Sequence, residues 1–449
     1  MPCFSLSSLA VATTGLCLAL SATAVHAQSA GQTPPAAVTP PTPAQVSPQR
    51  PPADKPPSLS VDALLDIVLT HNADLQAAQQ GRIGALAGVQ SASAYANPRV
   101  EWQTGRNQAR MPGTPAGNVH GWGISQLIEN PAARSARIDA AEAYARGAGH
   151  AVALTRNAIA SETRLLAKQY LLRRAEATVS EENLALLEQV RERVQLRVRS
   201  GEAARYELIK ADAEIVHARE RMQTARLQAE QVLVALNRLA AGKLPSRWTL
   251  GGALDEAPPL PALVDLQQLA ENDNPELRAM QTEVDRAEAQ LRGARASRLP
   301  GVEVRVGQTN EPEVRQSTVG LNLQIPLFDR REGAIGEASA DLERLRGRLA
   351  GRRAEMREQV RLAWQALEIA SLRVQALSEG VVKDAEAALR VAQAAYQFGE
   401  RGILDVLDAQ RVLRSARADL LQARFQVQAA RIELDTLAGR YAVPPATQP

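Results

Sequence analysis

Apolar residues recur every three or four positions along most of the chain, which is the period of an amphipathic α-helix. In one long stretch Leu187, Val190 and Val194 follow a line that is typical of a coiled-coil seam, whereas Leu196 lies on the opposite, polar face. Two stretches of about 70 residues contain no internal proline and would each span roughly 100 Å. The helical stretches are 60–96, 132–200 and a returning stretch that ends near 241, then 264–297, 330–398 and a returning stretch that ends near 439.

Four shorter segments alternate apolar and polar residues with a period of two, which predicts β-strands. In one of them Val302, Val304 and Val306 alternate with polar or small residues. A transmembrane β-strand has the same pattern, over about 9–11 residues with one apolar face. The strands are expected at about 98–106, 118–128, 300–308 and 317–327. The residues expected to face a barrel lumen are Glu101, Gln103, Glu303, Arg305, Asn322 and Gln324.

The chain contains one unit twice in tandem, in the order helix, two strands, long helix, turn, helix. Each copy has about 200 residues, and we attribute small changes in the offset between matching residues to differences in loop length. The matches are Asn72–Leu75 with Asn274–Leu277, Val100-Glu101 with Val302-Glu303 and Gly105 with Gly307 at an offset of 202, Gly123-Ile124 with Gly320-Leu321 and Ile138 with Ile335 at 197, and Gly201-Glu202 with Gly399-Glu400 at 198.

The lengths of the helices predict how they pack. The returning helix of the first copy and the opening helix of the second copy together have about the length of one long helix. We therefore expect these two helices to stack end to end and to run antiparallel beside a long helix.

The first residues have the pattern of an export signal. Leu9–Val25 carries no charge and is followed by His26-Ala27, which completes a small-x-small cleavage pattern. A retained anchor is the alternative, and lipidation of Cys17 is disfavoured because Leu16, rather than a small residue, precedes it. The expected division is a signal peptide at 1–27, a proline-rich disordered leader at 28–58, the first repeat at 59–245, a linker at 246–263, the second repeat at 264–441 and a flexible tail at 442–449.

Composition excludes several classes of protein. The 449 residues include only 3% aromatics and carry a formal net charge of +3, which is too balanced for a nucleic-acid-binding protein. Cys3 and Cys17 both precede residue 28, so the rest of the chain has no disulfide framework. The histidines are scattered, and no nucleophile, phosphate-binding or metalloprotease motif occurs. We expect no catalytic residues, no metal site and no cofactor.

Four membrane strands per chain require several chains to assemble. Four strands cannot close a barrel, and open edges in lipid leave backbone groups unpaired at several kcal/mol each. Two chains would give eight strands around a filled lumen, whereas three would give twelve strands with room for a passage. The polar lumen series favours the wet passage and therefore the trimer.

Three segments, together with the tandem repeat, carry a family resemblance. They are Asn97-Pro98 at the first strand, Val319–Phe328 along the fourth, and Gly399–Gln410 after the second long helix. Over about residues 58–441 the chain resembles the TolC-like outer-membrane factors, the outer membrane efflux protein family.

A further segment resembles one branch of this family. Ser125–Glu129, followed by Arg134 and Arg137, is similar to the branch that serves heavy-metal cation efflux, the cobalt–zinc–cadmium type. The chain departs from that branch at Pro131–Arg134, where Gly-Lys-Arg is usual.

The resemblance implies a mainly α-helical homotrimer with a small β part, in which a twelve-stranded barrel continues into a helical periplasmic tunnel. It implies an outer-membrane location in a Gram-negative bacterium. The implied partners are outer-membrane lipid, a periplasmic adaptor (membrane fusion protein) and an inner-membrane pump of the resistance-nodulation-division class, with no nucleic acid. The implied adaptor-docking tips are Gly201, Glu202, Gly399 and Glu400. The implied periplasmic aperture contains Asp405 and Asp408, with Glu207 and Lys210 as first-copy counterparts, and Lys210 is expected to pair with a neighbouring acid.

The expected function is the outer-membrane channel of a tripartite efflux system that exports heavy-metal cations. Two alternatives keep the channel and change its cargo: efflux of drugs or organic solutes, and type I secretion. A third alternative, from another class, is a periplasmic coiled-coil scaffold without a pore. That scaffold would explain the helices but not the alternating strands at matched positions in both copies. An enzyme is not expected.

Overall fold

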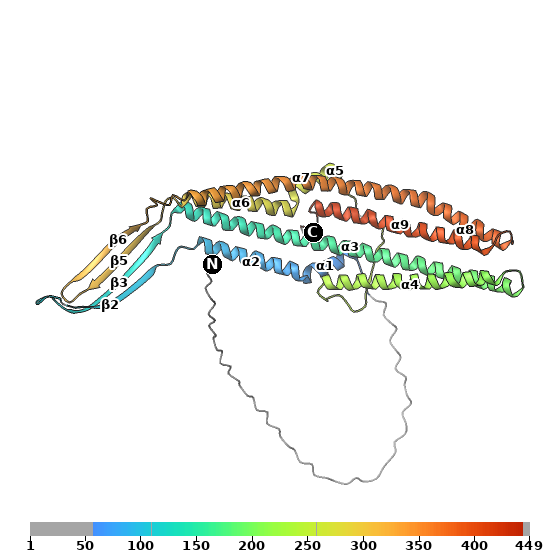
Figure 1. Ribbon diagram of the computed structural model, residues 1–449, viewed down its shortest axis with the longest axis horizontal. Helices are drawn as coiled ribbons and strands as arrows, with labels where there is room; N and C mark the ends of the chain where they lie inside the picture. The colour runs from blue at the N-terminus through green and yellow to red at the C-terminus, as the bar shows by residue number, and fades with distance from the viewer. Residues whose placement is uncertain (1–56, 109, 257, 443–449) are drawn as a thin grey trace, which may run out of the picture. The chain divides into compact units, whose positions relative to one another are not determined.

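The computed structural model describes residues 57–108, 110–256 and 258–442, which belong to one structural unit (Figure 1). The expected signal peptide at 1–27, the leader up to residue 56 and the tail beyond 442 lie outside the described residues. The first copy contains β1 (Ser58–Leu59), α1 (Val61–His71), α2 (Ala73–Ser93), β2 (Arg99–Asn107), β3 (Gly117–Ile128), α3 (Pro131–Arg199) and α4 (Arg205–Leu239). The short strand β4 (Thr249–Leu250) follows and pairs in parallel with β1. The second copy contains α5 (Leu263–Asp273), α6 (Pro275–Ala296), β5 (Val302–Asn310), β6 (Arg315–Leu323), α7 (Glu332–Ala376), the π-helical turn η1 (Leu377–Val381), α8 (Val382–Gln397) and α9 (Ile403–Leu437).

The described part is mostly helical with a smaller sheet, as the hydrophobic pattern predicts. The four-stranded sheet lies at one end of the long helices, and the turns that follow α3 and α8 lie at the other end (Figure 1). The predicted seam on α3 is confirmed, because Leu187, Val190 and Val194 are buried in one cluster with Tyr396 and Ile403. Leu196 is 65% exposed, as expected for the polar face.

The opening helix of each copy is broken, so the two single helices predicted at 60–96 and 264–297 are wrong. Asn72 separates α1 from α2, and its Oδ1 accepts hydrogen bonds from the backbone N–H groups of Asp74 (3.0 Å) and Leu75 (3.1 Å). Asn274 caps α6 in the same way, and Pro275 occupies the first helical position. An asparagine at the N-cap starts a new helix because it satisfies N–H groups that have no partner within the helix.

The same two asparagines determine which helices stack end to end. Asn72 Nδ2 donates to the carbonyl oxygen of Leu239, at the end of α4, over 3.0 Å. Asn274 Nδ2 donates to the carbonyl oxygen of Leu437, at the end of α9, over 2.8 Å. Thus α4 continues into α2 and α9 into α6, each within one copy. The expectation that the returning helix stacks on the opening helix of the next copy is therefore wrong.

Between matched positions, the long helix of the second copy has one residue more than α3. Ile138 and Gly201 are 63 positions apart, whereas their counterparts Ile335 and Gly399 are 64 apart. In the second copy η1 interrupts the helix, and the N–H of Val382 donates to the carbonyl oxygen of Leu377, five residues earlier. A π turn holds one more residue than an α turn. The change of offset from 197 to 198 therefore lies inside a helix and is not a difference in loop length.

The linker between the copies lies on α3. Arg174 Nη1 donates to the carbonyl oxygen of Leu250 over 2.8 Å, and Lys168 Nζ donates to those of Ala253 (3.2 Å) and Leu254 (3.3 Å). Burial lowers the pKa of Lys168 below its ordinary value. These contacts fix the chain as it passes from the first copy to the second.

Candidate functional site: the sheet, the junction below it and the interhelical turns

The four-stranded sheet has the order β2-β3-β5-β6, and every pair is antiparallel. All four predicted strands are present. The fourth ends at Leu323 rather than at 327, because Leu323 pairs with Val302, the first residue of β5. Gln324, predicted to face the lumen, therefore lies just beyond β6.

The pairing registers separate the side chains onto two faces. Directly opposite residues share a face of an antiparallel sheet, and the face alternates along each strand. One face carries Glu101, Gln103, Gly121, Gly123, Ser125, Glu303, Arg305, Gly307, Gly320 and Asn322. The other, mostly apolar face carries Val100, Trp102, Trp122, Ile124, Val302, Val304, Val306, Val319, Leu321 and Leu323. The register thus brings five of the six predicted lumen residues onto one face.

Polar side chains interact across the first of these faces. Arg305 forms an ion pair with Glu101, and it reaches across β3, where Gly123 lies opposite Glu101 and has no side chain. Asn322 Nδ2 donates to Glu303 Oε2 over 3.3 Å. Gln103 covers Gly121, where an added Cβ would lie 2.7 Å from its Nε2. The residues predicted to face the lumen did not include Gly121 and Gly123, although their spacing of two along a strand places both on the polar face.

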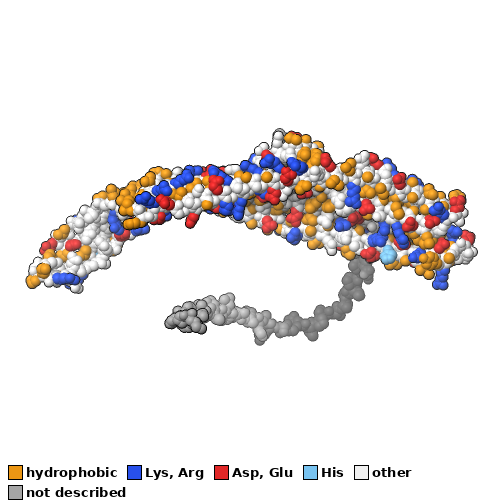
Figure 2. All heavy atoms as spheres, turned by 45° about the horizontal axis from the view of Figure 1, so that its top comes forward, with side chains coloured by type: hydrophobic (Ala, Val, Ile, Leu, Met, Phe, Trp, Pro, Cys, Tyr) orange, Lys and Arg blue, Asp and Glu red, His pale blue; other side chains and the backbone are white. Residues whose placement is uncertain are grey.

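The opposite face is exposed to solvent in the isolated chain. Val319 is 80% exposed, Leu321 is 74% exposed, and Trp102 is 71% exposed. Figure 2 shows acidic and basic side chains interspersed along the helices on the face it displays. An exposed apolar patch that is larger than a few hundred Å² usually meets a membrane or another protein.

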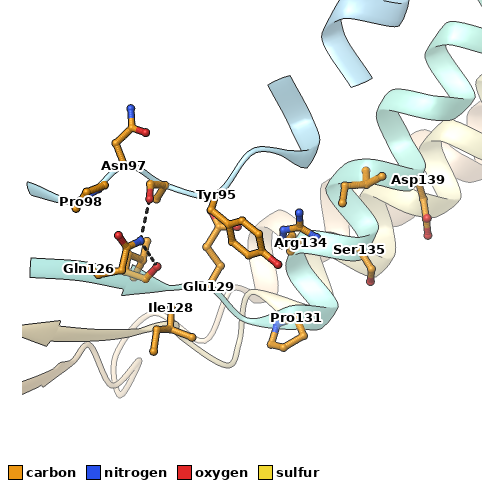
Figure 3. Close-up of a pocket in the computed structure, with 13 residues that line it drawn as sticks. Tyr95, Asn97, Pro98, Gln126, Ile128, Glu129, Pro131, Arg134, Ser135 and Asp139 are labelled. Carbon is orange, nitrogen blue, oxygen red and sulfur yellow. Dashed lines mark hydrogen bonds between the residues drawn. The ribbon is translucent and has the colours of Figure 1, made fainter. Parts of the chain in front are cut away.

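A cavity of about 820 Å³ lies where β2 and β3 meet the start of α3 (Figure 3). Its wall includes Tyr95–Pro98 and Arg134, and the Arg134 guanidinium lies 4.3 Å from the centre of the Tyr95 ring. Arg134 also donates to the carbonyl oxygen of Ser93, at the end of α2.

Beside this cavity, Arg137 joins the end of β3 to the end of α2. Its two terminal nitrogens donate to Glu129 over 2.9 and 2.8 Å, and these bonds lower the pKa of Glu129 below its ordinary value. Its Nε donates to the carbonyl oxygen of Ala92 over 3.0 Å. Arg137 therefore satisfies a carbonyl group that the end of α2 leaves unpaired.

The two interhelical turns have the same geometry. Gly201 has φ +81° and Gly399 has φ +75°, a conformation that glycine adopts without steric strain. The N–H of Glu202 donates to the carbonyl oxygen of Arg197 over 2.8 Å, and Glu400 makes the equivalent bond over 2.9 Å, so both turns are Schellman caps. All four predicted tip residues are exposed at these turns.

The four residues of the expected aperture lie in the first two turns of α4 and α9. Asp405 and Asp408 are both exposed, and Arg401 lies 3.8 Å from Asp405. Glu207 and Lys210 are half-buried. Among the residues that the structure describes, Lys210 makes no ion pair, and its ammonium lies 5.6 Å from the centre of the Tyr206 ring.

Within residues 57–442, apart from the undescribed 109 and 257, no group of three or more His, Cys, Asp and Glu residues is placed to hold a metal ion. None of the described helices is long and apolar enough to cross a membrane.

The chain is similar to known outer membrane efflux proteins and to solved outer-membrane channels. Residues 266–440 match the protein-family model described as outer membrane efflux protein. The described chain is similar to the solved structure of the outer-membrane channel OprN, with a TM-score of 0.74 and 18% identity, covering 85% of this chain and 91% of the other. It is also similar to a solved structure of CusC, with a TM-score of 0.67 and 20% identity, covering 84% of this chain and 91% of the other.

A curated relative extends this similarity over most of the chain. The cobalt-zinc-cadmium resistance protein CzcC of Cupriavidus metallidurans is 25% identical over 386 residues, which are 85% of this chain and 90% of CzcC. These matches confirm the family resemblance recognised from the sequence: residues 266–440 match the outer membrane efflux protein model, and the chain has the fold of solved outer-membrane channels. The fold that the chain shares with these solved structures is that of outer-membrane channels.

Proposed function

We propose that the protein is the outer-membrane channel of a tripartite efflux system of the resistance-nodulation-division class, and that it exports heavy-metal cations. The observation that carries this proposal is the sheet, which has one apolar and one polar face and joins helices as long as 69 residues. In the proposal the pump supplies the energy, and this protein supplies a conduit and a gate.

The sheet requires lipid on one side and further strands at both edges. Its apolar face gains free energy on leaving water, at about 25 cal/mol per Å² of apolar surface. Three copies would close a barrel of twelve strands and enclose the polar face around an aqueous lumen. This closure removes the edges that would otherwise leave backbone groups unpaired in lipid.

The opposite end of the helices supplies the proposed gate and docking site. Under three-fold symmetry Asp405 and Asp408 would place six carboxylates around one aperture, which favours the passage of cations. The exposed turns at Gly201-Glu202 and Gly399-Glu400 would meet the periplasmic adaptor. The mixed first-copy pair, Glu207 and Lys210, makes the proposed ring unequal between the copies.

The proposal of a metal cargo is supported by the relative CzcC, whose name records resistance to cobalt, zinc and cadmium. A second relative, the outer membrane efflux protein BepC of Brucella suis, is 24% identical over 59% of this chain and 59% of BepC. Its name records efflux without a metal, so the cargo is the part of the proposal that needs its own test.

We expect deletion of the gene to raise the sensitivity of its host to cobalt, zinc and cadmium, and the unaltered protein to restore resistance. Leu321→Arg should fail to restore it, because arginine on a lipid-facing strand costs about 2–4 kcal/mol at the bilayer midplane. Asn322→Arg, one residue further on the polar face, is the matched control and should reach the outer membrane.

Two outcomes would count against the proposal. Raised sensitivity to organic solutes, with unchanged metal sensitivity, would favour the drug-efflux alternative. Normal outer-membrane assembly of the Leu321→Arg protein would show that the apolar face does not meet lipid.

A further inference from the structure

The two edges of the sheet are β2 and β6, and within the described residues neither has a strand on its outer side. The inference drawn here rests on the proposed membrane barrel, in which β6 of one protein chain meets β2 of the neighbouring chain. Because all neighbouring strands of the sheet are antiparallel, this new pair is antiparallel as well. The open question is its register, which decides which side chains meet.

The chain contains an internal counterpart of this junction. β3 is the last strand of the first copy and β5 is the first strand of the second copy, and they pair directly. β6 matches β3 at an offset of 197, and β2 matches β5 at an offset of 202. The pair of β3 with β5 within one chain is therefore equivalent to the pair of β6 with β2 of the neighbouring chain.

We propose that β6 and the partner's β2 pair in the register of this internal junction. Internally, Gly123 lies opposite Gly307, Ser125 opposite Arg305, and Ile128 opposite Val302. Applying the two offsets places Gly320 opposite the partner's Gly105, Asn322 opposite the partner's Gln103, and Ile325 opposite the partner's Val100.

The side chains on both strands agree with this register. It places Leu323 beside the partner's Trp102 on the apolar face and Gln324 beside the partner's Glu101 on the polar face. A slip by one residue would set apolar side chains against polar ones along the whole pair. A slip by two would keep the faces but would separate Gly320 from the partner's Gly105, and so lose the glycine pair that the internal junction has.

The register also accounts for the early end of β6. Gln324 and Ile325 have no partner on β5, which begins at Val302. Beside the partner's β2 they gain residues to pair with, so β6 extends by two residues. The alternation that predicts a longer fourth strand is thus satisfied only between copies.

The segments below the strands fit the same alignment. Internally, Asn130 Nδ2 donates to the carbonyl oxygens of Ala296 (2.8 Å) and Leu299 (2.9 Å). Its counterpart 197 positions later is Leu327, followed by Phe328, which are 68% and 102% exposed. The offset of 202 places the partner's Ala94–Asn97 beside them.

At the junction between chains, an apolar contact thus replaces the contact that Asn130 makes at the internal junction. Tyr95–Pro98 form one wall of the cavity of about 820 Å³ (Figure 3). In the proposed junction, Leu327 and Phe328 of one copy lie against this wall in the next copy.

Disulfide formation between copies tests the register. Replacing Cys3 and Cys17, the two cysteines of the chain, with serine gives a cysteine-free background. In this background Asn322→Cys is combined with Gln103→Cys. Two further variants combine Asn322→Cys with Glu101→Cys or with Gly105→Cys. Membranes that contain each variant are oxidised, and the covalently linked multimer is measured without reductant. Directly opposite residues have Cα atoms about 4.5–5.5 Å apart, within the reach of a disulfide, whereas residues two positions away are about 7–8 Å apart.

Within one chain β2 and β6 are separated by β3 and β5, so each of these links joins two copies. Ser125→Cys with Arg305→Cys, an opposite pair inside one chain, is the control for oxidation. We expect at least tenfold more covalently linked multimer with Gln103→Cys than with either displaced partner.

The two failures are distinct. Preferential linkage through Glu101→Cys or Gly105→Cys would overturn the register and leave the barrel intact. Absence of linkage with all three partners, while the internal control oxidises, would overturn the register and the proposed barrel together.

Discussion

Asn72 and Asn274 each join two helices with one side chain. The amide oxygen caps the start of one helix, and the amide nitrogen binds the last carbonyl groups of another. Both side chains are buried, so loss of the amide would remove a cap worth about 1 kcal/mol and leave a buried carbonyl unpaired at a further 1–3 kcal/mol. These contacts hold each pair of stacked helices in line beside the long helices.

At the residue scale, the proposed aperture makes a prediction about ion flow. We expect Asp405→Ala combined with Asp408→Ala to raise the conductance of the purified channel in planar bilayers and to reduce its preference for cations. Removal of the carboxylates would release the ion pair with Arg401 and lower the negative charge around the aperture.

Asp419→Ala, which removes an exposed acid further along α9, is the matched control and should leave the conductance unchanged. Unchanged conductance in the double variant as well would remove Asp405 and Asp408 from the aperture.

Sequence reasoning reached some site residues and missed others for identifiable reasons. The alternation along the strands predicted the shared face of Glu101, Glu303 and Arg305. It did not predict that Arg305 reaches Glu101 across Gly123, because that contact depends on the order of the strands in the sheet. The bond from Asn72 to Leu239 spans 167 positions, so no local pattern could reveal it.

At the element scale, the long helices of the two copies span matched positions with different numbers of residues. α3 is a regular helix of 69 residues, whereas the second copy accommodates one additional residue in η1. The repeat offset contained this information, because it changes from 197 to 198 between Ile335 and Gly399. We predicted one uninterrupted helix over 330–398, so the π turn was not foreseen.

We expect deletion of Ser378, within η1, to leave an assembled protein in the outer membrane. The deletion converts the π turn to a regular α turn, and so the buried faces on both sides keep their orientation. Deletion of Ser180, in the regular helix α3, should reduce the assembled protein at least tenfold. It rotates the following residues by about 100°, which turns Leu187, Val190 and Val194 away from their cluster.

The readout for both deletions is the amount of protein in the outer-membrane fraction and its resistance to limited proteolysis. Equal losses would contradict the assignment of the additional residue to η1.

At the scale of the whole molecule, the tandem repeat supports the proposal that several chains assemble. Each copy contributes two strands and a pair of stacked helices, and the internal junction between β3 and β5 joins the copies. The edges at β2 and β6 have the same need for a partner, which the proposed trimer meets with two further chains. The sequence predicted the repeat and the strands, whereas the proposed partners of the edge strands lie in other chains and no pattern within one chain can reveal them.

The native mass of the protein, extracted with detergent from the outer-membrane fraction, tests the proposed trimeric channel. We expect a complex of three chains. A monomer or dimer that is recovered in soluble form from the periplasm would contradict it, because the four strands would then have no barrel to complete and the scaffold alternative would fit better.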